Sequence, residues 1–106
     1  MNCQIVYIWD MITKNEILLR LKELKPTLYK DFAVIEIGLF GSFADGNYTD
    51  ESDIDLLVEF EKPIGWKFFT LELHLESIFK RKIDLVTRNS IKDQIKENIL
   101  KQVNYA

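Results

Sequence analysis

Five residues of this chain have types and spacings that could support chemistry at a phosphate group. Asp53 and Asp55 stand two positions apart at the start of a β-rich run. Because strand side chains alternate between faces, both carboxylates point to one side, and the residue between them points to the other. Adjacent carboxylates repel each other unless a cation neutralises them, and oxygen ligands on an open site suit Mg²⁺. The pair therefore predicts a Mg²⁺ site.

The other three candidates are Asp84, Gly41 and Ser42. A third carboxylate from Asp84 would let the site hold two ions, usually ~3.5–4 Å apart, which stabilise the attacking and leaving oxygens in a displacement at phosphorus. Gly41-Ser42 would begin a short helical turn whose free backbone N–H groups face an anion, with the Ser42 hydroxyl as a further donor. These features predict a phosphate-binding turn beside the metal site.

Helices and strands are predicted to alternate along the chain. Thr13 and Glu16 have capping-box spacing before a helix over residues 14–30, with Pro26 as a point where it bends or ends. Strands are predicted at 34–40, 54–60 and 82–87, and a second helix at 66–80. Ser90 is expected to cap a last helix, whose apolar stripe is Ile91, Ile95, Ile99 and Val103.

Connection lengths indicate how these strands pair. The helix-sized link between the second and third strands allows parallel pairing, whereas the shorter link from residue 41 to residue 53 favours antiparallel neighbours. We expect an α/β fold: one domain over residues 1–106, with a small mixed sheet in the order 1-2-3 flanked by helices. The first 10 to 12 residues are either a loosely attached extension or the product of an upstream start codon. This topology brings all five candidate residues to one sheet edge.

Composition narrows the function classes. Apolar residues make up 47% and charged residues 29%, a globular mixture. The net charge of −3 argues against long nucleic acid as a ligand, since that affinity comes from clustered cations. The one cysteine, Cys3, cannot form an internal disulfide, and the apolar opening stretch is too short to span a membrane. We expect a cytoplasmic protein that binds neither long nucleic acid nor a membrane.

Three blocks of sequence carry a family resemblance. Gly41-Ser42, the step from Ala44 to Gly46, and Ser-Asp-Ile-Asp-Leu-Leu-Val at residues 52–58 resemble the signature of the DNA polymerase β-type nucleotidyltransferase superfamily. The small size is similar to its minimal nucleotidyltransferase branch, and the resemblance extends from about the first helix to the last. It implies the palm-like nucleotidyltransferase fold. Many members carry Arg between the alanine and the second glycine, where this chain has Asp45.

The resemblance also implies roles and partners. Gly41 and Ser42 would bind the triphosphate, Asp53 and Asp55 would ligate Mg²⁺, and Asp84 would ligate metal and help to activate the acceptor hydroxyl. Minimal nucleotidyltransferases often act as antitoxins that transfer AMP from ATP to a tyrosine hydroxyl of a HEPN ribonuclease toxin. The alternative is a non-catalytic module that neutralises its partner by binding. A weaker alternative is modification of a small-molecule hydroxyl.

Structural explanations compete with these roles. Asp53 and Asp55 could belong to a solvated acidic loop, Asp84 could be a strand-edge aspartate, and Ser42 could cap a turn. The basic run at residues 80–82 is typical of a solvated helix end. A second apolar face of the 66–80 helix must be covered by a flanking helix, a second subunit or another protein, and its residues are Trp66, Phe69 and Leu73.

Overall fold

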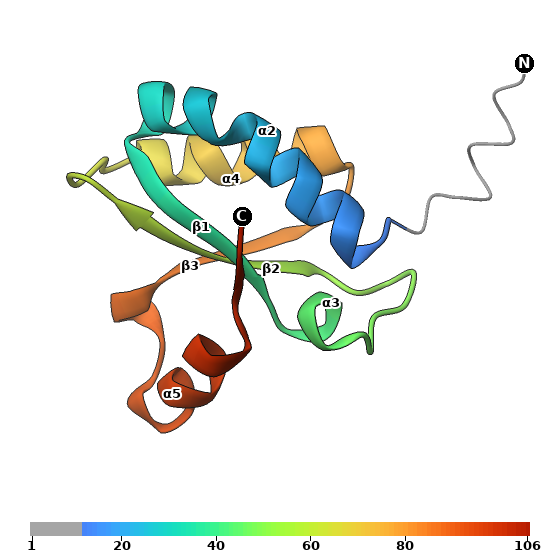
Figure 1. Ribbon diagram of the computed structural model, residues 1–106. Coiled ribbons are helices and arrows are strands. Elements are labelled where there is room, and N and C mark those ends of the chain that lie inside the picture. Colours follow the sequence, from blue (N-terminus) through green and yellow to red (C-terminus); the bar gives the residue numbers. More distant parts are fainter. Residues whose placement is uncertain (1–11) are drawn as a thin grey trace, which may run out of the picture.

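The computed structural model in Figure 1 describes residues 12–106, so nearly all of the extension predicted for the first 10 to 12 residues lies outside the described part of the chain. Its helices are α2 (Lys14–Phe32), α3 (Ser42–Asp45), α4 (Lys67–Phe79) and α5 (Asp93–Gln102), with a 3₁₀ turn, η1 (Arg88–Ser90). Its strands are β1 (Val34–Phe40), β2 (Ile54–Phe60), β3 (Ile83–Thr87) and β4 (Asn104–Tyr105).

The four strands form one mixed sheet in the order β3-β2-β1-β4. β1 pairs with β2 antiparallel and β2 pairs with β3 parallel, which confirms the predicted order and directions of the first three strands. The sequence did not predict β4, which adds to β1 by pairing Tyr105 with Gly38. A β-carbon at Gly38 would lie 2.6 Å from Val103 Cγ2, so the missing side chain lets the end of the chain approach β1.

Helix α2 begins with the predicted capping box. The Thr13 hydroxyl accepts a bond from the Glu16 N–H, and the Glu16 carboxylate accepts one from the Thr13 N–H, both at 3.2 Å. Pro26 lies inside the helix without ending it, and the helix runs two residues beyond its predicted end at residue 30. It stops at Ala33, whose φ of 60° is left-handed and whose N–H caps the carbonyl oxygens of Leu28 and Tyr29.

The two faces of the sheet carry different layers, as Figure 1 shows with α2 and α4 on one side and α5 on the other. Ile54, Leu56 and Val58 of β2 enter the main core beneath α2 and α4. Leu57 faces the opposite way and packs with Phe40 in a smaller cluster on the α5 side. The odd-numbered positions of β2 therefore face α5, and Asp55 is one of them.

Two predictions for the last helix were wrong. Ser90 does not cap it, because its hydroxyl accepts from the Thr87 N–H at 3.1 Å and donates to the Thr87 carbonyl at 2.8 Å, which closes η1. Helix α5 begins three residues later, with Lys92 at the N-cap. Ile91 is buried before the helix starts, whereas Ile95 is 49% exposed. The predicted four-residue stripe is therefore not a single buried face.

The outer strand β3 has its outward backbone N–H groups satisfied by side chains. Glu76 accepts from the Ile83 N–H at 3.2 Å, Glu72 accepts from the Leu85 N–H at 3.3 Å, and the Ser90 hydroxyl accepts from the Thr87 N–H. Both glutamates come from α4. Helix α4 is thus tied to the outer edge of β3, while Asp84 of the same strand pairs with Asp55 of β2.

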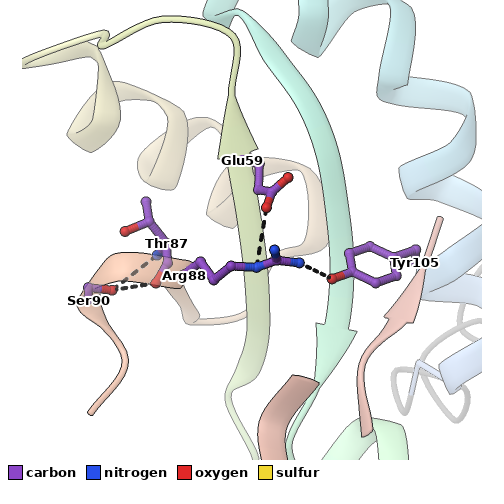
Figure 2. A network of polar contacts seen from close by, with 5 residues as sticks. All are labelled: Glu59, Thr87, Arg88, Ser90 and Tyr105. Carbon is purple, nitrogen blue, oxygen red and sulfur yellow. Dashed lines mark hydrogen bonds and ion pairs between the residues drawn. The ribbon is translucent and has the colours of Figure 1, made fainter. Parts of the chain in front are cut away.

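At the far end of the sheet, a polar network ties η1 to the neighbouring strands. Figure 2 shows Arg88 reaching Glu59 of β2 at 3.3 Å and the Tyr105 hydroxyl of β4 at 3.4 Å. Arg88 and Tyr105 are exposed and Glu59 is only partly buried, so each contact contributes little stability by itself. The network lies at the opposite end of β2 from Asp55.

No helix described between residues 12 and 106 is long and apolar enough to cross a membrane.

Candidate active site

The sheet register places Asp55 directly beside Asp84. The two residues are partners in the parallel β2–β3 ladder, one position after the partners Ile54 and Ile83. Ile54 and Ile83 are buried in the main core, so the two aspartates face the other side of the sheet. The Asp55 side chain is half-buried and Asp84 is exposed. Two of the three predicted carboxylates thus meet at the start of their strands.

Gly41, at the end of the neighbouring strand β1, packs against the Asp55 carboxylate. Phe40, the last residue of β1, pairs with Asp55, and Gly41 follows it. A β-carbon on Gly41 would lie 3.0 Å from Asp55 Cγ and would collide with Asp55 Oδ2. The φ of Gly41 is 75°, a left-handed value that other residues adopt only at a cost. The glycine is therefore required both by its backbone and by its contact with Asp55.

Asp53 lies half-buried at the end of the loop that leads into β2. The loop is held by its own side chains, since the Ser52 hydroxyl accepts from the Thr49 N–H at 2.8 Å. The next residue is fixed to β3, because the Ile54 N–H donates to the Lys82 carbonyl at 3.0 Å. Asp53 is thus placed between an ordered loop and the first bond of the β2–β3 ladder.

Arg81 is a contributor that the sequence interpretation missed. It was assigned to a solvated basic run, but it is half-buried, and its guanidinium donates to three backbone carbonyls of the loop before Asp53. No local pattern indicates contacts that span about thirty residues. The sequence offered one signal: Arg81 stands directly before the third strand, and the polar loop before Asp53 has backbone carbonyls that need hydrogen-bond donors.

The pKa shift of Asp55 identifies it as the central residue of the three-aspartate cluster. The pKa of Asp55 is raised from 3.8 to about 6 by partial burial first, then by the charges of Asp84 and Asp53 and by a hydrogen bond with Asp84. Burial is the largest cause, because it disfavours the charged carboxylate. The other two predicted aspartates therefore both lie close enough to Asp55 to repel its charge. A solvated acidic loop would not bring them this close.

The donor chemistry fits Mg²⁺. The ion pairs in the described part of the chain join Arg88 to Glu59 and Lys101 to Glu97, so none of the three aspartates has a cationic partner within 4.0 Å there. Within residues 12–106, no three acidic, His or Cys side chains converge closely enough to hold an ion unaided. Mg²⁺ commonly takes one or two carboxylates and completes its shell with water and substrate phosphate oxygens. The arrangement suits an ion bound together with a phosphate.

Stability without Mg²⁺ is expected to fall as pH rises through about 6. The folded protein binds the Asp55 proton more tightly than the unfolded chain does, because its pKa lies at about 6 instead of 3.8. The resulting stabilisation is fully present below the unfolded pKa and is lost as pH rises through the folded pKa. Urea unfolding of the wild type and the Asp55→Asn variant across this range should give curves that differ most at neutral pH. A constant difference between the two would contradict the assignment.

Helix α3 follows Gly41 and carries the predicted phosphate-binding residue Ser42. Its N-cap is Gly41, which has no side-chain hydrogen bond, so Ser42 is the first helical residue and does not cap the turn. Asp45 is exposed at the end of α3, where its carboxylate accepts from the Asn47 N–H at 3.1 Å. Asp45 is therefore on the same short turn as Gly41 and Ser42.

A hollow between α2 and β1 lacks this chemistry. It has a volume of about 500 Å³ and no carboxylate in its lining, which is Lys22, Lys25, Pro26, Tyr29, Val34 and Ile35. It shares no residue with the aspartate cluster. Because the cluster combines converging carboxylates with a perturbed pKa, it is the better candidate for an active site.

Comparisons with known proteins agree with this fold. Residues 14–105 match the nucleotidyltransferase domain family. The protein adenylyltransferase MntA of Thermococcus cleftensis is 41% identical over 96 residues, which covers 90% of this chain and 97% of that protein. The chain therefore belongs to the nucleotidyltransferase domain family, and its likeness to the minimal branch, predicted from the sequence, is confirmed.

Two solved structures share the fold. A structure named as a minimal nucleotidyltransferase has a TM-score of 0.74 at 24% identity, covering 89% of this chain and 96% of that one. An MNT antitoxin in complex with a tri-AMPylated HEPN toxin of Shewanella oneidensis has a TM-score of 0.55 at 21% identity, covering 91% of this chain and 70% of that one. The predicted fold class, a small mixed sheet flanked by helices, is confirmed.

Proposed function

We propose that this nucleotidyltransferase moves AMP from ATP to a hydroxyl group of a protein in a Mg²⁺-dependent reaction. The observation that carries the proposal is the Asp55–Asp84 pair, with Asp53 nearby and Gly41 packed against it. The 41% identity with a protein adenylyltransferase over nearly its whole length supports the choice of nucleotide and acceptor class.

In this proposal the residues of the site have different roles. Gly41 and Ser42 bind the triphosphate, Asp53, Asp55 and Asp84 hold Mg²⁺, and two ions fit a three-aspartate site. The ion would neutralise charge on the phosphates. Asp84, the exposed member, takes the proton from the acceptor hydroxyl. The acceptor oxygen bonds to the α-phosphorus, the bond from that phosphorus to the β-phosphate oxygen breaks, and pyrophosphate leaves.

The acceptor we propose is a HEPN toxin, which this chain would neutralise as its antitoxin. The structural neighbour bound to an AMPylated HEPN toxin supports this partner. A protein acceptor also suits a chain of 106 residues, since the partner supplies the surface that a separate substrate domain would otherwise provide. The exposed position of Asp84 leaves room for a hydroxyl from another chain.

The test is transfer of label from ATP to a co-purified HEPN-domain partner. Label in the α-phosphate should appear on the partner, whereas label in the γ-phosphate should not, because only AMP is transferred. Removal of Mg²⁺ by a chelator should stop the reaction. Equal labelling from both positions would indicate phosphorylation instead, and no labelling of any hydroxyl-bearing partner would contradict the proposal.

A second candidate function is neutralisation by binding without catalysis. Asp45 favours it, because it places a negative charge on the turn that would meet the triphosphate, where the family resemblance implies Arg in many members. In this case the partner would be inhibited equally by wild-type protein and by variants of the three aspartates. The labelling experiment and the inhibition assay together separate the two functions.

The Asp45→Arg variant is expected to bind ATP more tightly by about 1 kcal/mol, since it exchanges a repulsive charge for a cation able to pair with phosphate. The gain should shrink as salt is added, because Asp45 is exposed. Isothermal titration with ATP measures it. Asp50→Arg, on the exposed loop that follows, is the control with the same change in charge. Unchanged affinity of Asp45→Arg would show that this turn does not face the triphosphate.

The Phe69→Glu variant is expected to weaken association with a partner at least about tenfold while changing the melting temperature little. The predicted second face of α4 is open within the described chain, with Trp66, Phe69 and Leu73 exposed by 84%, 56% and 65%. Pull-down titration and calorimetry measure the two effects. Ile95→Glu, at a 49% exposed position of α5, is the control. A large fall in melting temperature with unchanged association would make Phe69 a core residue.

A further inference from the structure

We infer that Arg81 is a positioning residue for the carboxylate site, an inference that rests on the proposed function. Arg81 lies in the short connection between α4 and β3, three residues before Asp84. Its side chain crosses to the loop before Asp53 and to helix α3 after Gly41. One side chain therefore touches or adjoins each of the three segments that carry the candidate residues.

The first of these contacts fixes the loop that leads into β2. Arg81 Nη1 lies 2.7 Å from the Asp50 carbonyl, 2.9 Å from the Ser52 carbonyl and 3.4 Å from the Thr49 carbonyl. The Ser52 carbonyl belongs to the peptide bond that leads to Asp53. Bonds from a charged donor to a carbonyl are stronger than neutral ones, so this cluster restrains the backbone directly before Asp53.

The second contact fixes the turn that carries Ser42. The Arg81 guanidinium lies 5.4 Å from the centre of the Phe43 ring, within the range of a cation–π interaction. Phe43 is fully buried and stacks on Tyr48 at 4.4 Å between ring centres. Arg81 is thereby packed between the ring of α3 and the carbonyls of the loop, which limits how far it can move.

The consequence is that the loop residue Asp53 is restrained relative to Asp84 on β3. Asp84 is held by its place in β3, and Asp53 lies outside the β2 ladder, which begins at Ile54. The Asp53 carboxylate can therefore drift with the loop unless the loop is tied to β3, and Arg81 makes that connection. Because the bonds come from one nitrogen of a planar group that also stacks on a ring, a lysine can reproduce only part of the arrangement.

Two variants and a control test this role. Arg81→Met removes the donors but keeps the length of the side chain, Arg81→Lys keeps the charge, and Lys82→Met removes a neighbouring exposed charge. Mn²⁺ binding followed by electron spin resonance gives ion affinity without reference to activity. Residues that orient metal ligands commonly change affinity by about 10- to 100-fold. We expect Arg81→Met to lose at least tenfold, Arg81→Lys to lose less, and Lys82→Met to match the wild type.

Two further measurements separate positioning from general stability. Hydrogen exchange of the amides at residues 49–53 should accelerate in Arg81→Met, at a temperature well below its melting transition, while the amides of α2 stay protected. AMP transfer by Arg81→Met should recover as Mn²⁺ is raised, because the weakened step is ion binding. A merely structural role would give faster exchange throughout the chain and no recovery.

The outcomes distinguish this inference from the proposed function. Wild-type protein that binds Mn²⁺ but transfers nothing would contradict the proposed function, while the affinities would still measure the role of Arg81. Equal Mn²⁺ affinity in Arg81→Met and Lys82→Met would overturn the role of Arg81. A wild type that does not bind Mn²⁺ at all would overturn both. If Arg81→Met does not fold, Arg81→Lys provides the same comparison with a milder change.

Discussion

The Asp55→Asn variant is expected to lose nucleotidyl transfer at least about 100-fold, since residues that only orient metal ligands already cost about 10- to 100-fold. Asparagine keeps the shape of the side chain but removes the charge that would hold Mg²⁺. Without Mg²⁺ at neutral pH, the variant should also be more stable than the wild type, because it no longer buries a charge, and the repulsion from Asp84 and Asp53 is gone as well. Labelled transfer and thermal unfolding measure the two effects.

The Asp53→Asn variant should lose transfer to a similar degree, with a smaller gain in stability. Asp50→Asn is the control, because Asp50 is an exposed acid of the same loop. Adding Mg²⁺ should raise the melting temperature of the wild type and of the control, but not that of Asp55→Asn. Equal transfer by Asp55→Asn and the wild type at saturating Mg²⁺ would contradict the proposed site.

The Gly41→Ala variant is expected to be nearly as inactive, for a steric reason. Its new methyl group would collide with the Asp55 carboxylate, so that carboxylate must move away from Asp84. A non-glycine residue in the left-handed region also costs about 1–2 kcal/mol of stability. We expect lower stability together with at least tenfold weaker Mn²⁺ binding and transfer, measured by the assays described above.

Gly46→Ala separates the backbone cost from the collision. Gly46 also has a left-handed φ, 87° against 75° for Gly41, but a β-carbon there would meet nothing within 4 Å. Both alanine variants should lose backbone stability, and Gly41→Ala should lose more, because its ψ of −152° is almost confined to glycine, whereas Gly46 has a ψ of 3° in the left-handed helical region. Only Gly41→Ala should lose ion binding. If Gly46→Ala lost ion binding as well, the effect would come from distortion of α3 and not from contact with Asp55.

Local patterns in the sequence were sufficient for the parts of the site that lie on regular strands. The two-residue period correctly separated Asp55 from Ile54, and the lengths of the connections correctly placed β2 between β1 and β3. Together these two rules predict that Asp55 lies near Asp84, and the strand register confirms it. The proposed catalytic roles of these residues remain predictions, for which the variants above are the test.

Other features depend on contacts that no local pattern contains. Strand β4 has two residues, too few for a recognisable period, and forms because Gly38 lets it approach β1. Ser90 resembles a helix cap, but its hydroxyl closes the turn after β3 instead. Arg81 resembles a solvated end of a helix, and only the fold brings the loop carbonyls within its reach. Strand β4 and the contacts of Arg81 thus depend on the tertiary fold, whereas Ser90 satisfies a neighbouring turn instead of the helix.

The capped backbone of β3 bears on how the protein behaves at high concentration. An outer strand normally offers free N–H groups that another chain can pair with, which is a common start of amyloid-like assembly. Here Glu76, Glu72 and Ser90 already occupy the outward N–H groups of β3, and the two glutamates add negative charge along that margin. A second molecule would have to displace these side chains before it could extend the sheet. The folded chain is therefore protected against polymerisation from the edge of the sheet nearest to Asp84.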